Sequence, residues 1–183
     1  MMGMVFDEFF SYVTEEYSED MVDDIIIDSK LDNDGAYTAV GRYDPSELIN
    51  LVVALSERTK APVENIVKGF GFFVFPKLYL SHKQYLPDWQ SPFEVFRKID
   101  NHIHIEVQKF YPNAELPSFS VEKDTENEMT LFYSSARPLA TFAEGIIQGC
   151  IAHFNANMAV HHEQLGQNGK YFQSRFTITK EAA

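Results

Sequence analysis

One short run of alternating residues constrains this chain more than any other feature. Residues Met129 to Arg137 alternate in the way that is typical of a β-strand. Residues two apart in a strand point the same way, so Tyr133, Ser135 and Arg137 are expected on one face, about 6–7 Å between neighbours. They form a ladder of hydrogen-bond donors with one fixed positive charge. Because arginine binds carboxylates and phosphates through paired contacts, we expect this strand to hold a ligand with two anionic groups.

Length and composition narrow the class of protein. The 183 residues suit one ordinary domain, and we expect a single domain over residues 1–183. Sixteen phenylalanines and nine tyrosines indicate either a large core or a pocket for a flat apolar ligand. A net charge of −12 argues against binding to nucleic acid or to anionic membranes. With the single Cys150, no membrane-length apolar run and no signal sequence, a cytoplasmic protein is expected.

The order of the expected elements indicates the fold class. Helical periodicity and capping signals predict helices at Val5–Val13, Met21–Ile27, from Asp44 and Pro45, from Pro62, over Pro92–Phe110 and over Leu139–Phe154. Period-two patterns predict strands at Met129–Arg137, Met158–His162 and Tyr171–Thr179. A helical N-terminal part followed by an antiparallel sheet with an inserted helix is an α+β fold.

The histidines offer competing chemistries. His102 and His104 lie on an expected helix, where residues two apart diverge by about 200°, so they are not expected to share a metal. One of them can still be a single axial ligand, and the plainer alternative is a core or partly exposed histidine. His161 and His162 lie on an expected strand and point to opposite faces. An alternative is a metal-dependent enzyme, without haem, that uses all of these histidines together with Glu163. It would need a strand where a helix is expected, and it gives Arg137 no role.

No phosphate loop, nucleophile elbow or catalytic triad spacing is present. An anion-binding strand, a histidine on a helix and a phenylalanine-rich interior together fit a haem. A haem needs an axial imidazole, apolar walls and polar partners for two propionates. A purely structural domain, whose aromatic residues all lie in the core, stays open as a third reading.

These features, in this order, resemble the haem–nitric oxide/oxygen binding (H-NOX) family, which includes the haem domain of soluble guanylate cyclase. The resemblance covers nearly the whole chain. It rests on Met2–Val5, Phe70–Phe75, His104 seven residues before Tyr111-Pro112, Leu116–Phe119, Tyr133–Arg137 and Glu144–Gly149.

The resemblance implies a cofactor and the residues that hold it. The cofactor is haem b, ferrous iron protoporphyrin IX, placed between the helical part and the sheet. His104 matches the proximal iron ligand of the family. Tyr133, Ser135 and Arg137 match the motif that holds the propionates, and Pro117 matches a proline that presses on the porphyrin.

The resemblance also implies which gases bind. Val5, Phe9 and Ile146 match residues against the haem, and oxygen-binding members carry a tyrosine where this chain has Phe142. Val74 replaces a polar partner found in oxygen binders. Without a donor to stabilise bound oxygen, ferrous haem here is expected to bind nitric oxide and carbon monoxide and to form no stable oxygen complex.

The resemblance implies a signalling role. Nitric oxide is expected to weaken the bond between iron and His104 and so to change the conformation. With no cyclase or receptor domain in the sequence, the chain resembles stand-alone bacterial members, whose usual partners are a histidine kinase or a cyclic-di-GMP enzyme.

Overall fold

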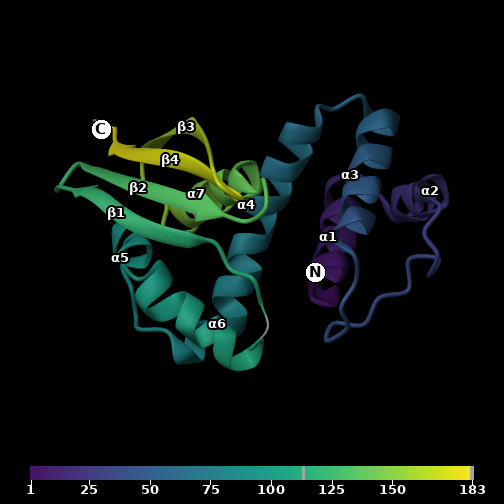
Figure 1. Cartoon of the computed structure of the whole chain (residues 1–183), viewed down its shortest axis with the longest axis horizontal. Helices are drawn as coiled ribbons and strands as arrows, with labels where there is room; N and C mark the ends of the chain where they lie inside the picture. The colour runs from purple at the N-terminus through teal and green to yellow at the C-terminus, as the bar shows by residue number, and fades with distance from the viewer. Residues whose placement is uncertain (113, 182–183) are drawn as a thin grey trace. The chain divides into compact units, whose positions relative to one another are not determined.

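The computed structural model describes residues 1–112 and 114–181 (Figure 1). The chain divides into two compact units, Met1–Phe70 and Gly71–Ala183, and each is described by itself. Within the described residues, no helix is long and apolar enough to pass through a bilayer.

The first unit is built from helices whose ends are marked in the sequence. They are α1 (Gly3–Glu16), α2 (Glu19–Ser29), α3 (Pro45–Thr59) and the first part of α4 (Val63–His82). Asp44 caps α3 through the N–H of Ser46 at 2.8 Å, and Glu47 completes the expected capping box. The Ser18 side chain caps α2. These caps satisfy N–H groups that have no partner inside their helices.

The core of the first unit comes from the apolar stripes of these helices. Its fully buried side chains are Phe6, Phe9, Val13, Ile25, Leu51 and Leu55. On the surface, Nη1 of Arg58 in α3 lies 2.5 Å from Oδ2 of Asp24, and its Nε lies 2.5 Å from Oδ2 of Asp28, both in α2. These contacts hold α2 beside α3, although exposed ion pairs add little stability.

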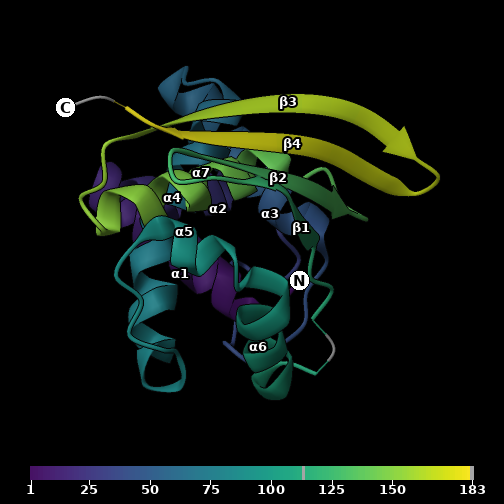
Figure 2. The same cartoon turned by 90° about the vertical axis from the view of Figure 1, so that its left-hand side faces the viewer.

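The second unit combines helices with an antiparallel sheet. After the rest of α4 come η1 (Lys83–Tyr85), α5 (Pro92–Phe96), the π-helical turn η2 (Ile99–Ile103), α6 (His104–Phe110), β1 (Ser118–Asp124), β2 (Glu128–Ser135), α7 (Ala140–His153), β3 (Met158–Asn168) and β4 (Tyr171–Lys180). The strand order is β1-β2-β4-β3, and β3 and β4 form a long curved hairpin (Figure 2). The expected α+β class, with a helix inserted between strands, is confirmed.

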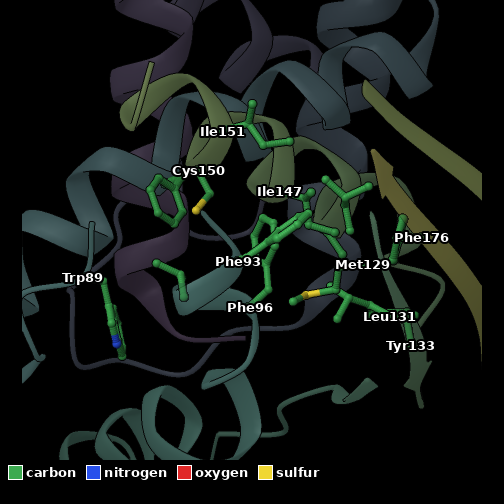
Figure 3. Packing of buried hydrophobic residues seen from close by; sticks show 14 of the residues in the cluster. Trp89, Phe93, Phe96, Met129, Leu131, Tyr133, Ile147, Cys150, Ile151 and Phe176 are labelled. Atoms are coloured by element: carbon green, nitrogen blue, oxygen red, sulfur yellow. The ribbon is translucent and has the colours of Figure 1, made fainter. Parts of the chain in front are cut away.

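The central strand β2 shows the predicted alternation. Met129, Leu131 and Tyr133 are at most 1% exposed, and Ser135 is 9% exposed. These residues share one face of the sheet, as their spacing predicts. Around them pack aromatic residues of α5 and apolar residues of α7 and β4 (Figure 3).

Helices α4 and α7 approach each other closely at a glycine. A Cβ placed on Gly149 would lie 2.6 Å from the Phe72 carbonyl oxygen and 2.9 Å from Cβ of Phe75. Pro76 lies inside α4 and has no N–H, so the Phe72 carbonyl lacks its usual helical donor. Gly149 therefore packs against a carbonyl whose usual donor four residues on is a proline.

Two expectations near the motif need correction. The strand was expected to run to Arg137, but β2 ends at Ser135 and Arg137 lies in the bend that follows. There the Leu139 N–H donates to the Arg137 carbonyl at 2.9 Å, so the chain turns around Pro138. Proline has no backbone N–H and cannot donate to a neighbouring strand. Tyr133 and Ser135 share a strand face, and Arg137 is held by the turn instead.

The expected helix over 92–110 is broken into three pieces. Helix α5 ends at Phe96, and the N–H groups of His102 and Ile103 both donate to the Lys98 carbonyl, which produces the π-helical turn. The reason is a tertiary contact, because the turn brings Asp100 to the backbone of β1.

Two strands also differ from the expectation. Strand β1 was not expected, and β3 continues six residues past its expected end, His162, to Asn168.

Candidate functional site

His104 is the first residue of α6 and follows the π-helical turn directly. Its Nδ1 lies 2.8 Å from Oδ1 of Asp100, four residues earlier in the chain. The His104 side chain is 17% exposed and that of Asp100 is 33% exposed. With Nδ1 directed to a carboxylate, Nε2 is the ring nitrogen left to bind a metal, which is the usual arrangement of a metal-ligating histidine.

The protonation of His104 suits that role. Burial lowers the pKa of the imidazole below its ordinary value of 6.5, and the nearby Asp100 raises it by less than burial lowers it. The ring is therefore neutral at neutral pH. A neutral imidazole is the form that binds a metal.

Asp100 joins the histidine to the sheet. Its Oδ2 accepts the N–H of Phe119 at 2.8 Å, while its Oδ1 faces His104. The centre of the Phe119 ring lies 6.1 Å from the centre of the His104 ring and 5.1 Å from that of the Tyr133 ring. Sequence reasoning missed Asp100, although an acidic residue four positions before a helical histidine was a usable signal.

Tyr133 and Ser135 form the buried part of the motif. Burial raises the pKa of the Tyr133 phenol, and a hydrogen bond with the Ser135 side chain lowers it by less. The phenol therefore keeps its proton and can act as a donor. The Ser135 Oγ also accepts the N–H of Arg137 at 3.1 Å, which fixes the start of the bend.

Arg137 supplies the charge of the motif. Its side chain is 32% exposed, and its Nη2 lies 2.5 Å from Oε2 of Glu115. Glu115 belongs to the connection between α6 and β1, two residues before Pro117, and Pro117 directly precedes β1. The predicted polar residues and Pro117 thus all lie in the second unit.

The predicted apolar residues divide between the two units. Val74 of α4 is 4% exposed, and Phe142 and Ile146 lie one turn apart on α7. Helices α4 and α7 meet near these residues, since a Cβ on Gly71 would contact the Phe142 carbonyl and the Ile146 backbone nitrogen.

Val5 and Phe9 lie on α1 of the first unit. Phe9 is fully buried, with its ring 5.3 Å from that of Phe70. The structure therefore brings the α4 and α7 residues together and places the α1 pair in a separate unit.

The alternative metal cluster does not form. In residues 1–112 and 114–181, no three histidine, cysteine, aspartate or glutamate side chains gather to hold a metal. The His102 ring packs 5.9 Å from that of Trp89. On β3, His161 is exposed, while His162 bonds to Glu144 of α7 at 3.0 Å. The histidines thus have separate surroundings.

The donor set fits a haem. One neutral imidazole with a carboxylate behind it matches an axial ligand, and a phenol, a hydroxyl and a guanidinium match partners for propionates. The side chains expected beside the porphyrin, those of Val5, Phe9, Val74, Phe142 and Ile146, carry no hydrogen-bond donor. The chemistry of these residues is therefore consistent with an iron porphyrin.

Comparisons with known proteins show the family of the chain. The model of a family described as Haem-NO-binding matches residues 2–162. An Fe(II) unliganded H-NOX protein from K. algicida is 34% identical, with a TM-score of 0.88, and the match covers 100% of this chain and 98% of that chain. The solution structure of an H-NOX from Shewanella woodyi, bound to IWP-051 in the Fe(II)CO state, is 36% identical, with a TM-score of 0.82 and coverage of 99% and 95%. An H-NOX protein from S. oneidensis in the Fe(II)NO state is 25% identical, with a TM-score of 0.88 and full coverage of both chains. No curated protein matches the chain.

Proposed function

Since the chain belongs to the Haem-NO-binding (H-NOX) family, we propose that it is a haem-based sensor of nitric oxide in which residues 1–183 act as one sensor domain. The arrangement that carries the proposal is His104 with Asp100 behind it, in the same unit as the Tyr133, Ser135 and Arg137 motif. The Fe(II)NO and Fe(II)CO states recorded for two relatives support the choice of gases.

His104 would bind the iron of haem b through Nε2. The Asp100 carboxylate, 2.8 Å from Nδ1, would favour the tautomer and the ring orientation in which Nε2 binds the iron. Tyr133 and Ser135 would donate to a propionate, and Arg137 would add the positive charge that a carboxylate prefers. The ferrous iron, when bound, supplies the site at which a diatomic gas binds.

The apolar residues would set the choice of gas. Bound oxygen is polarised and gains from a hydrogen-bond donor, whereas nitric oxide and carbon monoxide gain less. Val74 and Phe142 have no donor, and neither do Val5, Phe9 and Ile146. We therefore propose binding of nitric oxide and carbon monoxide, without a stable oxygen complex in air.

The switch would begin at His104. Weakening of the iron–histidine bond by nitric oxide would free the N-terminus of α6 from the cofactor, while Asp100 keeps it tied to β1. Pro117, which directly precedes β1, lies where such a shift would reach the sheet. A ligand changes a population only through unequal contacts in two states, and the His104 bond is the contact that differs. The partner would be a histidine kinase or a cyclic-di-GMP enzyme, and the chain itself would not be an enzyme.

Ultraviolet–visible spectra of the purified protein test this proposal. We expect a Soret band for ferrous protein that shifts with nitric oxide and with carbon monoxide and does not shift in air. His104→Gly should bind haem only when imidazole is added. Phe142→Tyr should introduce oxygen binding, while Phe132→Tyr, on the opposite face of β2 from Tyr133, should not. A stable oxygen spectrum in the unmodified protein would overturn the proposed selectivity, and a colourless protein would overturn the haem assignment.

A further inference from the structure

The arginine of the motif has a carboxylate partner within the chain. Nη2 of Arg137 lies 2.5 Å from Oε2 of Glu115, and the side chains are 32% and 70% exposed. Both groups can therefore be reached by solvent and by a ligand. The N–H of Arg137 is fixed by the Ser135 Oγ at 3.1 Å, so the backbone at this point is held independently of the ion pair.

The atom that Glu115 contacts matters for recognition of a second carboxylate. A guanidinium offers two paired faces to a carboxylate, Nε with Nη2 and Nη1 with Nη2. Both faces use Nη2, which has one hydrogen directed to each. A carboxylate on Nη2 of Arg137 therefore occupies one of the two faces, and its negative charge repels a second carboxylate that approaches the other.

Glu115 is carried by the connection that leads from the candidate iron ligand to the sheet. This connection joins the end of α6, which begins with His104, to the start of β1. At its beginning, the Ala114 N–H donates to the Tyr111 carbonyl at 2.9 Å. The ion pair joins residues 22 apart and links this connection to the bend that follows β2.

We propose that Glu115 competes with a haem propionate for Arg137, and that it sets how tightly the chain holds its cofactor. The inference rests on the proposed haem-binding function. Exposed ion pairs are weak, so we expect an effect of about threefold in haem release, reduced by salt. Glu115 would therefore act on haem retention only through Arg137, which it contacts.

The test compares wild-type protein with Glu115→Gln, which removes the charge and keeps the size of the side chain. Haem release is measured by transfer to an excess of apoglobin, first with haem and then with its dimethyl ester, which has no propionate charge. We expect Glu115→Gln to release haem about threefold more slowly at low salt, with a smaller difference at high salt. The dimethyl ester should be released equally by both proteins. The iron midpoint potential should shift to more positive values in Glu115→Gln, because loss of a negative charge favours the reduced iron.

Two variants serve as controls. Glu126→Gln makes the same charge change at an exposed position between β1 and β2, and it should release haem like the wild type. Glu115→Asp keeps the carboxylate and should stay close to the wild type.

Two results would overturn the inference while the proposed function stands. One is equal haem release by Glu115→Gln and wild type at low salt, and the other is an equal change for haem and for its dimethyl ester. Absence of haem from every variant would instead overturn the proposed function, and this inference with it.

Discussion

Asp100 and His104 are joined by a contact of 2.8 Å between Oδ1 and Nδ1 across one turn of the chain. The same carboxylate accepts the Phe119 N–H through its other oxygen, also at 2.8 Å. One side chain therefore fixes the orientation of the histidine and the start of β1 together. The Asp100 carboxylate therefore links the His104 ring to the sheet.

We predict that Asp100→Asn weakens haem binding by about tenfold. An asparagine has one acceptor oxygen, whereas both the His104 ring N–H and the Phe119 N–H need an acceptor, so one contact is lost. The measurement is haem affinity by Soret titration. Asp23→Asn, at an exposed position of α2, is the matched control and should bind haem like the wild type. Equal affinities for all three proteins would show that Asp100 does not support the ligand.

We predict that the iron–histidine bond survives moderate acid. Because burial lowers the pKa of His104 below 6.5, the ring stays neutral as the pH falls through that value, and protons compete with the iron only at lower pH. Spectra of the ferrous protein should therefore be unchanged between about pH 7.5 and 6.5. Loss of the histidine-ligated spectrum with a midpoint at or above 6.5 would contradict this assignment.

Much of the candidate site follows from local pattern. The alternation of β2 predicted the shared face of Tyr133 and Ser135, because a strand period depends only on the backbone. The Asp44 cap was predicted for the same reason, since capping depends on residues within one turn. The helix inserted between β2 and β3 was also predicted within a residue or two.

The rest depends on contacts between distant residues. Strand β1 exists because it pairs with β2, and its own pattern is weak and exposed. The partners of Arg137 and Phe119, Glu115 and Asp100, lie 22 and 19 residues away, and no spacing rule reaches that far. The π-helical turn also required knowledge of the Phe119 contact. Sequence pattern thus predicted which side chains carry the chemistry but not what orients them.

We predict that Gly149→Ala destabilises the protein by about 1–2 kcal/mol. The new Cβ would lie 2.6 Å from the Phe72 carbonyl oxygen and 2.9 Å from Cβ of Phe75, and neither atom is the end of a flexible side chain. Alanine favours a helix over glycine, so without this clash the variant would be more stable. Urea unfolding measures the difference. An unfolding free energy equal to or above that of the wild type would show that α4 and α7 can separate at little cost.

The largest effect on stability is expected at His162. Its Nδ1 lies 3.0 Å from Oε2 of Glu144, and its Nε2 lies 3.1 Å from the Ser174 Oγ. The side chains of His162 and Glu144 are each about one-tenth exposed. This network joins α7 to β3 and β4. Glu144 is a carboxylate in the interior, where loss of a partner is costly.

We predict that His162→Leu lowers the free energy of unfolding by about 2–3 kcal/mol, because Glu144 and Ser174 both lose a partner in the interior. The neighbouring His161 is exposed on the other face of the same strand, so His161→Leu should change stability by no more than about 0.5 kcal/mol. Urea unfolding of the two variants measures the contrast between adjacent histidines. A double-mutant cycle pairs His162→Leu with Glu144→Gln. The losses in unfolding free energy of the two single variants should add up to more than the loss of the double variant, because both substitutions remove the same bond. Similar losses for His161→Leu and His162→Leu, or strictly additive effects in the cycle, would show that the network does not hold α7 to the sheet.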